Sequence, residues 1–468
     1  MNIEERHQNF IDRDKLYSMI EGKEPSQSEL ETVINKSLEM KGLSLEEVAL
    51  LLRVEDPKQI HQIMEAAKTV KEEIYGKRLV LFAPIYTGNA CVNNCTYCSF
   101  RMDNKLIKRK VLSMDEIAQE TSSLLKEGHK RVLLICGESK RNDIDYMVEA
   151  IRTTYAVSTR DGKDSIRRIN VELAPMSVED FKKIKAEKIG TYVCFQETYD
   201  PIKYTEFHPA GTPKSDYMNR LTVMDRAMEA GIDDVGIGAL LGLIDYRFEI
   251  LAMMEHATHL ERAFGVGPHT VSVPRIEYAV GAPHSENIPA KVGDDDFKKL
   301  VAIIRLALPY TGIILSTRES DEMRNELIEY GVSQLSAGSK TNPGSYAHEE
   351  EGTGSQFSTG DHRTLEEVIG SLADHGYIPS FCTGCYRNGR VGHDFMDLAK
   401  PGLIKEYCMP NALFTFKEYL EDFGSEETKQ KGLNLIKKLV SEVNKPQLKT
   451  KIDENLENIH KGQRDIYF

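Results

Sequence analysis

The chain has 468 residues, 40% of them hydrophobic, which is enough for one large barrel with appendages or for two to three ordinary domains. Its formal net charge of −13 argues against non-specific binding to nucleic acid or to an anionic membrane surface. No apolar run approaches the length of a membrane span and the N-terminus is polar, so we expect no membrane segment, no signal peptide and a cytoplasmic location.

The N-terminal residues 1–76 have the pattern of a helical extension. Ser44 and Glu47 form a capping-box pattern before an apolar run, and apolar residues recur at helical spacing between 57 and 75. We expect this segment to cover a larger core without chemistry of its own.

From residue 77 to 340, short apolar runs alternate with amphipathic stretches. The predicted strands are 79–84, 131–136, 168–173, 190–195, 233–238, 270–274, 312–316 and 332–336. The predicted helices between them are 114–127, 142–155, 177–188, 215–230, 246–264, 294–308 and 321–330. Eight such units predict an α/β fold, a (β/α)8 TIM-type barrel; an open doubly wound sheet is the alternative. In a barrel of this kind, functional groups lie in the loops that follow the strands.

A first cysteine group follows the first predicted strand. Cys91, Cys95 and Cys98 have the spacing C-x3-C-x2-C. Three thiolates this close can ligate three irons of a [4Fe–4S] cluster and leave the fourth iron open for a small molecule. The alternative is zinc, which would need a fourth Cys or His nearby, and none lies within ten residues of Cys98.

Polar residues end the second and fourth predicted strands. Gly137 allows close backbone approach, and Glu138 can accept hydrogen bonds from an ammonium group, although an ordinary turn has the same composition. Gln196 and Glu197 end an apolar strand, and burying them without partners is costly, so we expect a ligand or a local polar network there.

The later strand ends supply candidate substrate-binding groups. Arg275 or Arg318 could pair with a substrate carboxylate, or either could form an ion pair at the barrel rim. Hydroxyl donors are expected from Ser316, Ser336 and Ser339.

After the barrel, residues 341–361 are rich in small and polar residues and predict a flexible loop. Residues 362–468 read as a C-terminal helical domain. It carries a second cysteine trio, Cys382, Cys385 and Cys408, spaced C-x2-C-x22-C. A zinc site with a distant His is one interpretation, and a second cubane with an open iron is the one we favour.

The first motif, with Tyr97 just before its third cysteine, resembles the signature of radical S-adenosylmethionine (SAM) enzymes. The runs 195–199 (Phe-Gln-Glu-Thr-Tyr) and 272–275 (Ser-Val-Pro-Arg) resemble the aromatic amino-acid lyases of that superfamily. The second trio, followed by residues 410–413 (Pro-Asn-Ala-Leu), resembles the HydG family of tyrosine lyases that mature [FeFe]-hydrogenase.

The resemblance implies that SAM binds the open iron and yields a 5′-deoxyadenosyl radical, with Tyr97, Gly137, Glu138, Gln196 and Glu197 around the cofactors. That radical would take a hydrogen from the amino group of L-tyrosine and break its Cα–Cβ bond to give p-cresol and dehydroglycine. Dehydroglycine would yield carbon monoxide and cyanide at a second [4Fe–4S] cluster, which bears a labile iron joined through free cysteine. The product would be an Fe(CO)(CN) precursor of the hydrogenase H-cluster.

A histidine would hold the labile iron. The candidates are His259 and His269, with His256 weaker, because they are expected at the barrel mouth opposite Cys91. A barrel lumen between the two clusters could protect the radical and the small fragment from water. A ferredoxin or flavodoxin would donate the electron, and other hydrogenase maturases are expected partners.

Two alternatives remain. The sequences around residues 134–139 and 275–280, and Lys340, differ from typical tyrosine lyases, so a paralogue cleaving another amino acid is one. A non-catalytic Fe–S carrier is the other.

Overall fold

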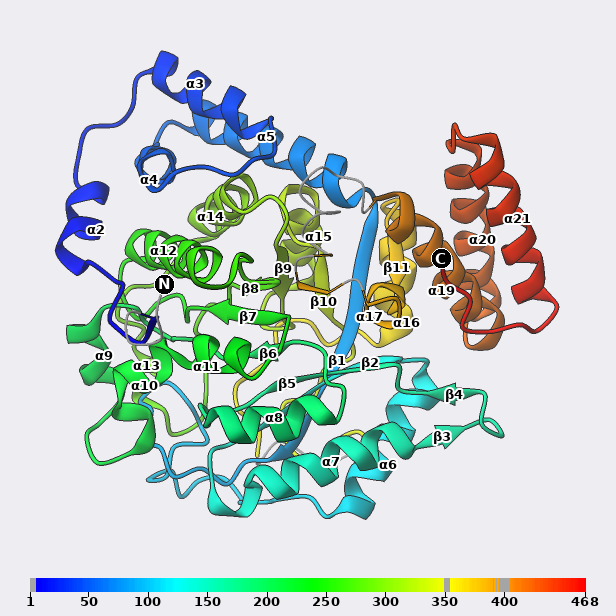
Figure 1. Ribbon diagram of the computed structural model, residues 1–468, viewed down its shortest axis with the longest axis horizontal. Helices are drawn as coiled ribbons and strands as arrows, with labels where there is room; N and C mark the ends of the chain where they lie inside the picture. Colours follow the sequence, from blue (N-terminus) through cyan, green and yellow to red (C-terminus); the bar gives the residue numbers. More distant parts are fainter. Residues whose placement is uncertain (1–5, 349–353, 390, 393, 395–404) are drawn as a thin grey trace.

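The computed structural model describes residues 6–348, 354–389, 391–392, 394 and 405–468. Its centre is a closed barrel of eight parallel strands (Figure 1). These are β1 (Arg78–Gly88), β2 (Arg131–Cys136), β5 (Arg168–Glu172), β6 (Tyr192–Val193), β7 (Val235–Gly238), β8 (Thr270–Ser272), β9 (Gly312–Leu315) and β10 (Gln334–Ser336). β10 pairs with β1, with Val80 opposite Gln334, and this pairing closes the barrel. The predicted barrel is therefore confirmed, and the open sheet is excluded.

Helices surround the barrel as crossover connections between its strands. They are α6 (Met114–Glu127), α7 (Ile144–Ala156), α8 (Val178–Ala186), α9 (Pro201–Phe207), α10 (Tyr217–Leu221), α11 (Val223–Glu229), α12 (Tyr246–Phe264), α14 (Asp294–Ala307) and α15 (Asp321–Tyr330). Short elements lie in the loops: η1 (Lys140–Asn142), η2 (Pro213–Ser215), α13 (Pro283–Glu286) and a hairpin of β3 (Ser158–Thr159) with β4 (Asp164–Ser165).

Local chemistry sets several of these helix boundaries. α6 begins at a capping box between Ser113 and Glu116 and ends at Gly128, whose φ of 100° only glycine adopts readily. The predicted helix 215–230 is instead divided at Thr222 into α10 and α11. α9 was not predicted; Asp200 caps it and Pro201 occupies its first turn.

The N-terminal segment is helical, as predicted, and it covers one side of the barrel (Figure 1). It contains α2 (Arg13–Ile20), α3 (Gln27–Ser37), α4 (Leu45–Leu52) and α5 (Pro57–Tyr75). α5 packs against α14 and α15 of the barrel. Buried Lys299 of α14 donates hydrogen bonds to the carbonyl oxygens of Leu52 and Val54, which fixes the end of α4 to the barrel.

The C-terminal region is not purely helical. Besides α16 (Leu365–Asp374), α17 (Gly384–Arg387), α19 (Lys405–Asp422), α20 (Glu426–Ser441) and α21 (Pro446–His460), it contributes the strand β11 (Ile378–Ser380). β11 pairs in parallel with the start of β1, with Ile378 opposite Arg78, and it leads directly to Cys382. This strand, which the sequence analysis missed, positions the second cysteine group against the barrel. Among the described helices, none is long and apolar enough to cross a membrane.

The predicted flexible loop 341–361 contacts the barrel closely in its described parts, and residues 349–353 lie outside the described residues. The side chain of Gln356 accepts a hydrogen bond from the Tyr86 hydroxyl at 2.8 Å, and Phe357 is buried. The loop therefore closes over the barrel mouth.

Candidate active site and second thiol site

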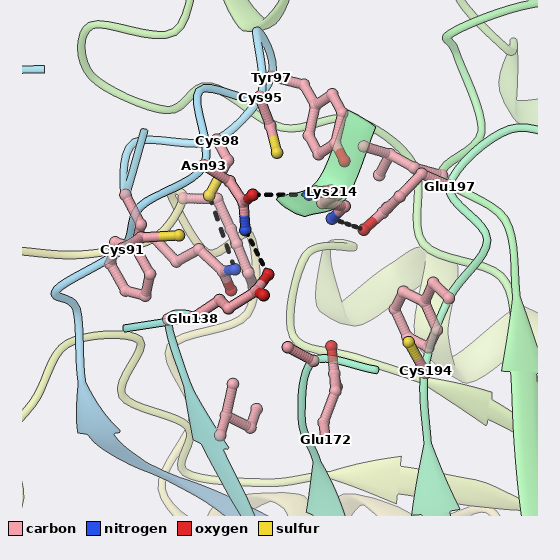
Figure 2. Close-up of a pocket in the computed structure, with 18 of the residues that line it drawn as sticks. Cys91, Asn93, Cys95, Tyr97, Cys98, Glu138, Glu172, Cys194, Glu197 and Lys214 are labelled. Carbon is pink, nitrogen blue, oxygen red and sulfur yellow. Dashed lines mark hydrogen bonds and ion pairs between the residues drawn. The ribbon is translucent and has the colours of Figure 1, made fainter. Parts of the chain in front are cut away.

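The first cysteine group borders a cavity at the carboxyl ends of the barrel strands (Figure 2). Cys91, Cys95 and Cys98 all line it, on the loop that follows β1. Burial raises the pKa of Cys95 and raises that of Cys98 to about 12, so these thiols need a bound metal to become thiolates at neutral pH. The cysteines therefore lie in a loop that follows a barrel strand, as predicted for functional groups in this fold.

Asn93 links this loop to the end of β2 and to η2. Its side-chain nitrogen donates to Glu138 Oε2 at 2.6 Å, and its oxygen accepts from the backbone nitrogen of Lys214 at 2.8 Å (Figure 2). Glu138, which follows β2, is thereby held at the cavity wall, where its other oxygen can accept from an ammonium group.

Gly137 packs tightly behind the cysteine loop. A Cβ at this position would lie 2.5 Å from the carbonyl oxygen of Ala90 and 3.1 Å from Cβ of Cys91. The residue is therefore glycine because the loop must approach this closely.

Glu197 forms the opposite wall of the cavity. Its Oε1 lies 2.6 Å from Lys214 Nζ and 3.4 Å from Arg220. Burial raises the pKa of Glu197, but these two cations outweigh it and lower the pKa below its usual value. The carboxylate is therefore ionised at neutral pH and can accept hydrogen bonds from a ligand.

Tyr97 also lines the cavity, and its hydroxyl lies 2.8 Å from His208 Nε2. Burial lowers the pKa of His208 to about 3, so this imidazole is neutral. The pair fixes the tyrosine ring between the cysteine loop and α9.

Two predicted residues lie elsewhere. Gln196 follows β6, is buried and does not line the cavity, and its side-chain amide has no hydrogen-bond partner among the described residues. Arg275 does not line the cavity; it pairs with Glu319 and with Asp294 at 2.7 Å, which is the rim ion pair that the sequence left open. Neither Gln196 nor Arg275 lines the first cavity or the lumen.

A second cavity occupies the barrel lumen below the first. It is lined by inward-facing residues of successive strands, among them Phe82, Leu133, Asn170, Val193, Ser316 and Ser336, and by Ser339. Six residues line both cavities: Ile135, Glu172, Phe195, Arg318, Gln356 and Phe357. We call this set the junction.

The junction carries two ions of opposite sign. Arg318 stacks on the ring of Phe357 at 3.4 Å, and no carboxylate of the described residues lies within ion-pair distance of it. Glu172, at the end of β5, points into the first cavity (Figure 2) and has no hydrogen-bond partner among the described residues. Burial and the nearby Glu197 raise the pKa of Glu172 to about 7.

The second cysteine group borders a third cavity, at the opposite end of the barrel. Cys382, Cys385 and Cys408 line it together with His269 and Tyr386. The Tyr386 hydroxyl lies 3.2 Å from His269 Nε2. The carbonyl oxygen of Cys382 accepts a hydrogen bond from Arg131 at 2.7 Å. Arg78 also lines this cavity, so cationic groups face the thiols.

His259, predicted as an iron ligand, does not lie beside the second cysteine trio. It lies on α12, where its Nε2 is 2.7 Å from Asp225 Oδ1 and its ring stacks on Phe10 at 4.0 Å. It does not line the third cavity, and neither does His256, whose Nδ1 lies 2.9 Å from the Tyr199 hydroxyl. The structure places only His269 of the three candidates beside the second trio.

In the described part of the chain, no three His, Cys, Asp or Glu side chains converge closely enough to hold one metal ion. Zinc requires all its ligands on one ion, whereas each cysteine of a cubane binds a different iron. Three cysteines at each of two cavities are the donor set that a cubane with an open iron needs.

Comparison with known proteins gives the family. Residues 85–257 match the model of the radical SAM superfamily, and residues 272–378 match the biotin and thiamin synthesis associated domain. A solved structure of HydG, a maturase of the [FeFe]-hydrogenase, is 47% identical and superposes with a TM-score of 0.95, covering 98% of this chain and 100% of that one. HydG from Carboxydothermus hydrogenoformans is 40% identical, with a TM-score of 0.84 over 97% of this chain and 100% of its own.

The chain belongs to the radical SAM superfamily. Within it the chain groups with the HydG maturases and with the 2-iminoacetate synthases; the enzyme of Salmonella typhimurium is 32% identical over 74% of this chain and 89% of its own. It is a radical SAM lyase that binds a [4Fe–4S] cluster and SAM. The predicted family and enzyme class are confirmed.

Several site residues were not predicted from sequence. Glu172 is the last residue of β5 and lies one residue before the end of the predicted strand 168–173, so the strand-end rule would have found it. Asn93 lies inside the cysteine motif. Lys214 precedes the predicted helix 215–230 and Arg220 lies within it, and only the fold brings both to Glu197.

Proposed function

We propose that this chain cleaves the Cα–Cβ bond of L-tyrosine to p-cresol and dehydroglycine, which is 2-iminoacetate. The observation that carries the proposal is the junction, where Arg318 and Glu172 offer one cation and one anion to a ligand between the first cysteine group and the lumen. An α-amino acid carries the complementary pair of charges. The name of the 2-iminoacetate synthase relatives supports the choice of product.

The residues of the chain have distinct roles in this proposal. Cys91, Cys95 and Cys98 would hold a [4Fe–4S] cluster, which together with SAM would supply a 5′-deoxyadenosyl radical. Glu138 would accept hydrogen bonds from the SAM ammonium group, and Glu197 would accept hydrogen bonds from the cofactor at the opposite wall.

The substrate is held at the junction. Arg318 binds its carboxylate, and Ile135, Phe195 and Phe357 exclude water from the reacting atoms. The serines of the lumen, Ser316, Ser336 and Ser339, offer hydroxyl groups to the polar parts of the substrate.

We further propose that the small fragment moves through the lumen to the third cavity. Residues 80, 82, 84 and 86 of β1 alternate inward along the whole length of this path. Cys382, Cys385 and Cys408 would hold a second [4Fe–4S] cluster. His269 would hold a labile iron that is joined to this cluster through a free cysteine. This site would supply the metal for release of carbon monoxide and cyanide. The product would be an Fe(CO)(CN) precursor of the hydrogenase H-cluster. A ferredoxin or flavodoxin in the cytoplasm would donate electrons, and other hydrogenase maturases would be partners.

The test is an anaerobic incubation of the reconstituted chain with SAM, dithionite and single amino acids, analysed by mass spectrometry. We expect p-cresol from tyrosine and 5′-deoxyadenosine in equal amount. A cleavage product from another amino acid would identify a paralogous lyase, and the absence of 5′-deoxyadenosine would leave only the Fe–S carrier. Replacing Cys382 and Cys385 together by Ala should abolish carbon monoxide and leave p-cresol; unchanged carbon monoxide would refute the second step.

A further inference from the structure

Glu172 is the one acidic residue of the junction, and the charged groups around it already have partners. Glu197, Lys214 and Arg220 form a closed ion cluster from the β6 end, η2 and α10. The Tyr86 hydroxyl of β1 donates to Gln356, and Asn93 donates to Glu138. Arg318, after β9, acts on Glu172 without a carboxylate partner of its own among the described residues, and Glu277 lines the first cavity on the side of Arg318.

The proposed reaction raises a proton problem. A free amino acid carries an ammonium group at neutral pH, whose nitrogen has no lone pair. Removal of a hydrogen atom from that nitrogen would leave a positively charged radical without a lone pair to delocalise the spin. The amine must therefore lose a proton before hydrogen abstraction, inside a cavity that excludes water.

We propose that Glu172 takes this proton from the substrate ammonium group. The inference rests on the proposed function. The N–H bond of the ammonium breaks heterolytically, its electron pair stays on nitrogen, and the proton forms an O–H bond on the carboxylate. The products are a neutral amine and a neutral carboxylic acid, and nothing is oxidised or reduced.

The placement supports this role. Glu172 and Arg318 line the same two cavities, and Glu172 points into the first cavity (Figure 2), so a substrate with its carboxylate on Arg318 would carry its ammonium group in the space that Glu172 borders. Burial and Glu197 favour the protonated form of Glu172, while Arg318, Arg220 and Lys214 act against it. A pKa of about 7 suits a group that must accept a proton near neutral pH.

The first test compares Glu172→Gln with wild type in the pH dependence of kcat/KM for p-cresol formation. Glutamine keeps the shape and cannot take a proton. We expect at least a roughly 100-fold loss near pH 7.5. As the pH rises, a larger fraction of free tyrosine already carries a neutral amine. The loss in kcat/KM should therefore shrink by about tenfold per pH unit. An equal loss at every pH would mean a merely structural role and would overturn the proposal.

Glu277→Gln is the matched control, because Glu277 lines the first cavity but not the junction. We expect its pH profile to keep the wild-type shape. If the kcat/KM of Glu277→Gln instead showed the loss that shrinks with rising pH, the proton acceptor would be Glu277 and the assignment of Glu172 would fail.

The second test measures binding without turnover, by calorimetry on the cluster-loaded chain with SAM and no reductant. Glu172→Gln should weaken tyrosine roughly ten- to hundredfold. Its effect on 3-(4-hydroxyphenyl)propionate, which lacks the amino group, should be absent. Equal weakening of both ligands would show that Glu172 does not meet the ammonium. Absence of p-cresol from the wild-type enzyme would instead sink the proposed function, so the two failures are distinguishable.

Discussion

Glu197 Oε1 and Lys214 Nζ lie 2.6 Å apart, and the backbone of Glu197 adopts a φ of 70°. That conformation is uncommon for a residue with a Cβ and costs on the order of 1 kcal/mol or more. The ion pair therefore holds the carboxylate at the cavity wall against a local backbone cost.

Replacing Glu197 by Gln should weaken SAM binding and the fold together. Lys214 and Arg220 would keep their charges in a buried place without a carboxylate, a loss of about 3 kcal/mol in the free energy of unfolding. Because the folded pKa is lowered, the wild-type advantage is complete above the unfolded value of 4.5 and is lost as the pH falls through the lower folded value. Urea unfolding at pH 7 and near pH 3 measures this; a difference that grows in acid would contradict it.

The two histidine candidates should respond in opposite ways. His269→Ala removes an imidazole beside the second trio, so we expect less iron per folded chain and no carbon monoxide, with p-cresol retained. His259→Ala breaks a buried pair with Asp225 and should lower the free energy of unfolding by about 3 kcal/mol while iron per folded chain stays constant. Iron analysis and unfolding curves on both variants measure these effects. Loss of iron in His259→Ala alone would show that His259, and not His269, holds the labile iron.

Gly137→Ala should displace the cysteine loop, because the new Cβ would meet the Ala90 carbonyl oxygen at 2.5 Å. We expect p-cresol formation to fall by at least 100-fold, since misplacement of reacting groups by about 1 Å has effects of this size. Gly293→Ala is the control: nothing lies within 4 Å of its Cβ position, so rate and stability should stay near wild type. Equal behaviour of the two variants would mean that the close approach is unimportant.

Much of the fold follows from the sequence alone. The eight barrel strands alternate with helices whose apolar spacing and caps are local signals, and Ser113 and Gly128 bound α6 as such signals predict. β11 has three residues and no pattern of its own; it becomes a strand because β1 offers it a partner. The strand β11 therefore depends on a tertiary contact, and the propensities of its residues do not predict it.

The candidate site divides in the same way. Cysteine spacing is local, so both trios could be predicted, and strand ends indicated Glu138, Glu197 and Arg318. The choice between His259 and His269 could not be made from sequence, because it depends on which imidazole meets Asp225 in the core. Arg275 and Arg318 likewise differ only in whether the fold supplies a carboxylate.

Arg318→Lys gives the sharpest test of substrate binding. Lysine keeps the charge but loses the planar fork that can pair with both oxygens of a carboxylate, and it also loses the stacking on Phe357. We expect KM for tyrosine to rise roughly ten- to hundredfold, with a smaller change in kcat.

Arg275→Lys is the matched control for that variant, since Arg275 is bound to Glu319 and Asp294 at the rim and does not line either cavity of the active site. Its effect should fall on stability, at about 1–2 kcal/mol, with KM unchanged, because lysine can satisfy one of the two carboxylates but not both. Steady-state p-cresol kinetics on the two variants, normalised to cluster content, separate these effects. A rise in KM for Arg275→Lys with none for Arg318→Lys would mean that the substrate carboxylate binds Arg275 at the rim and not Arg318 at the junction.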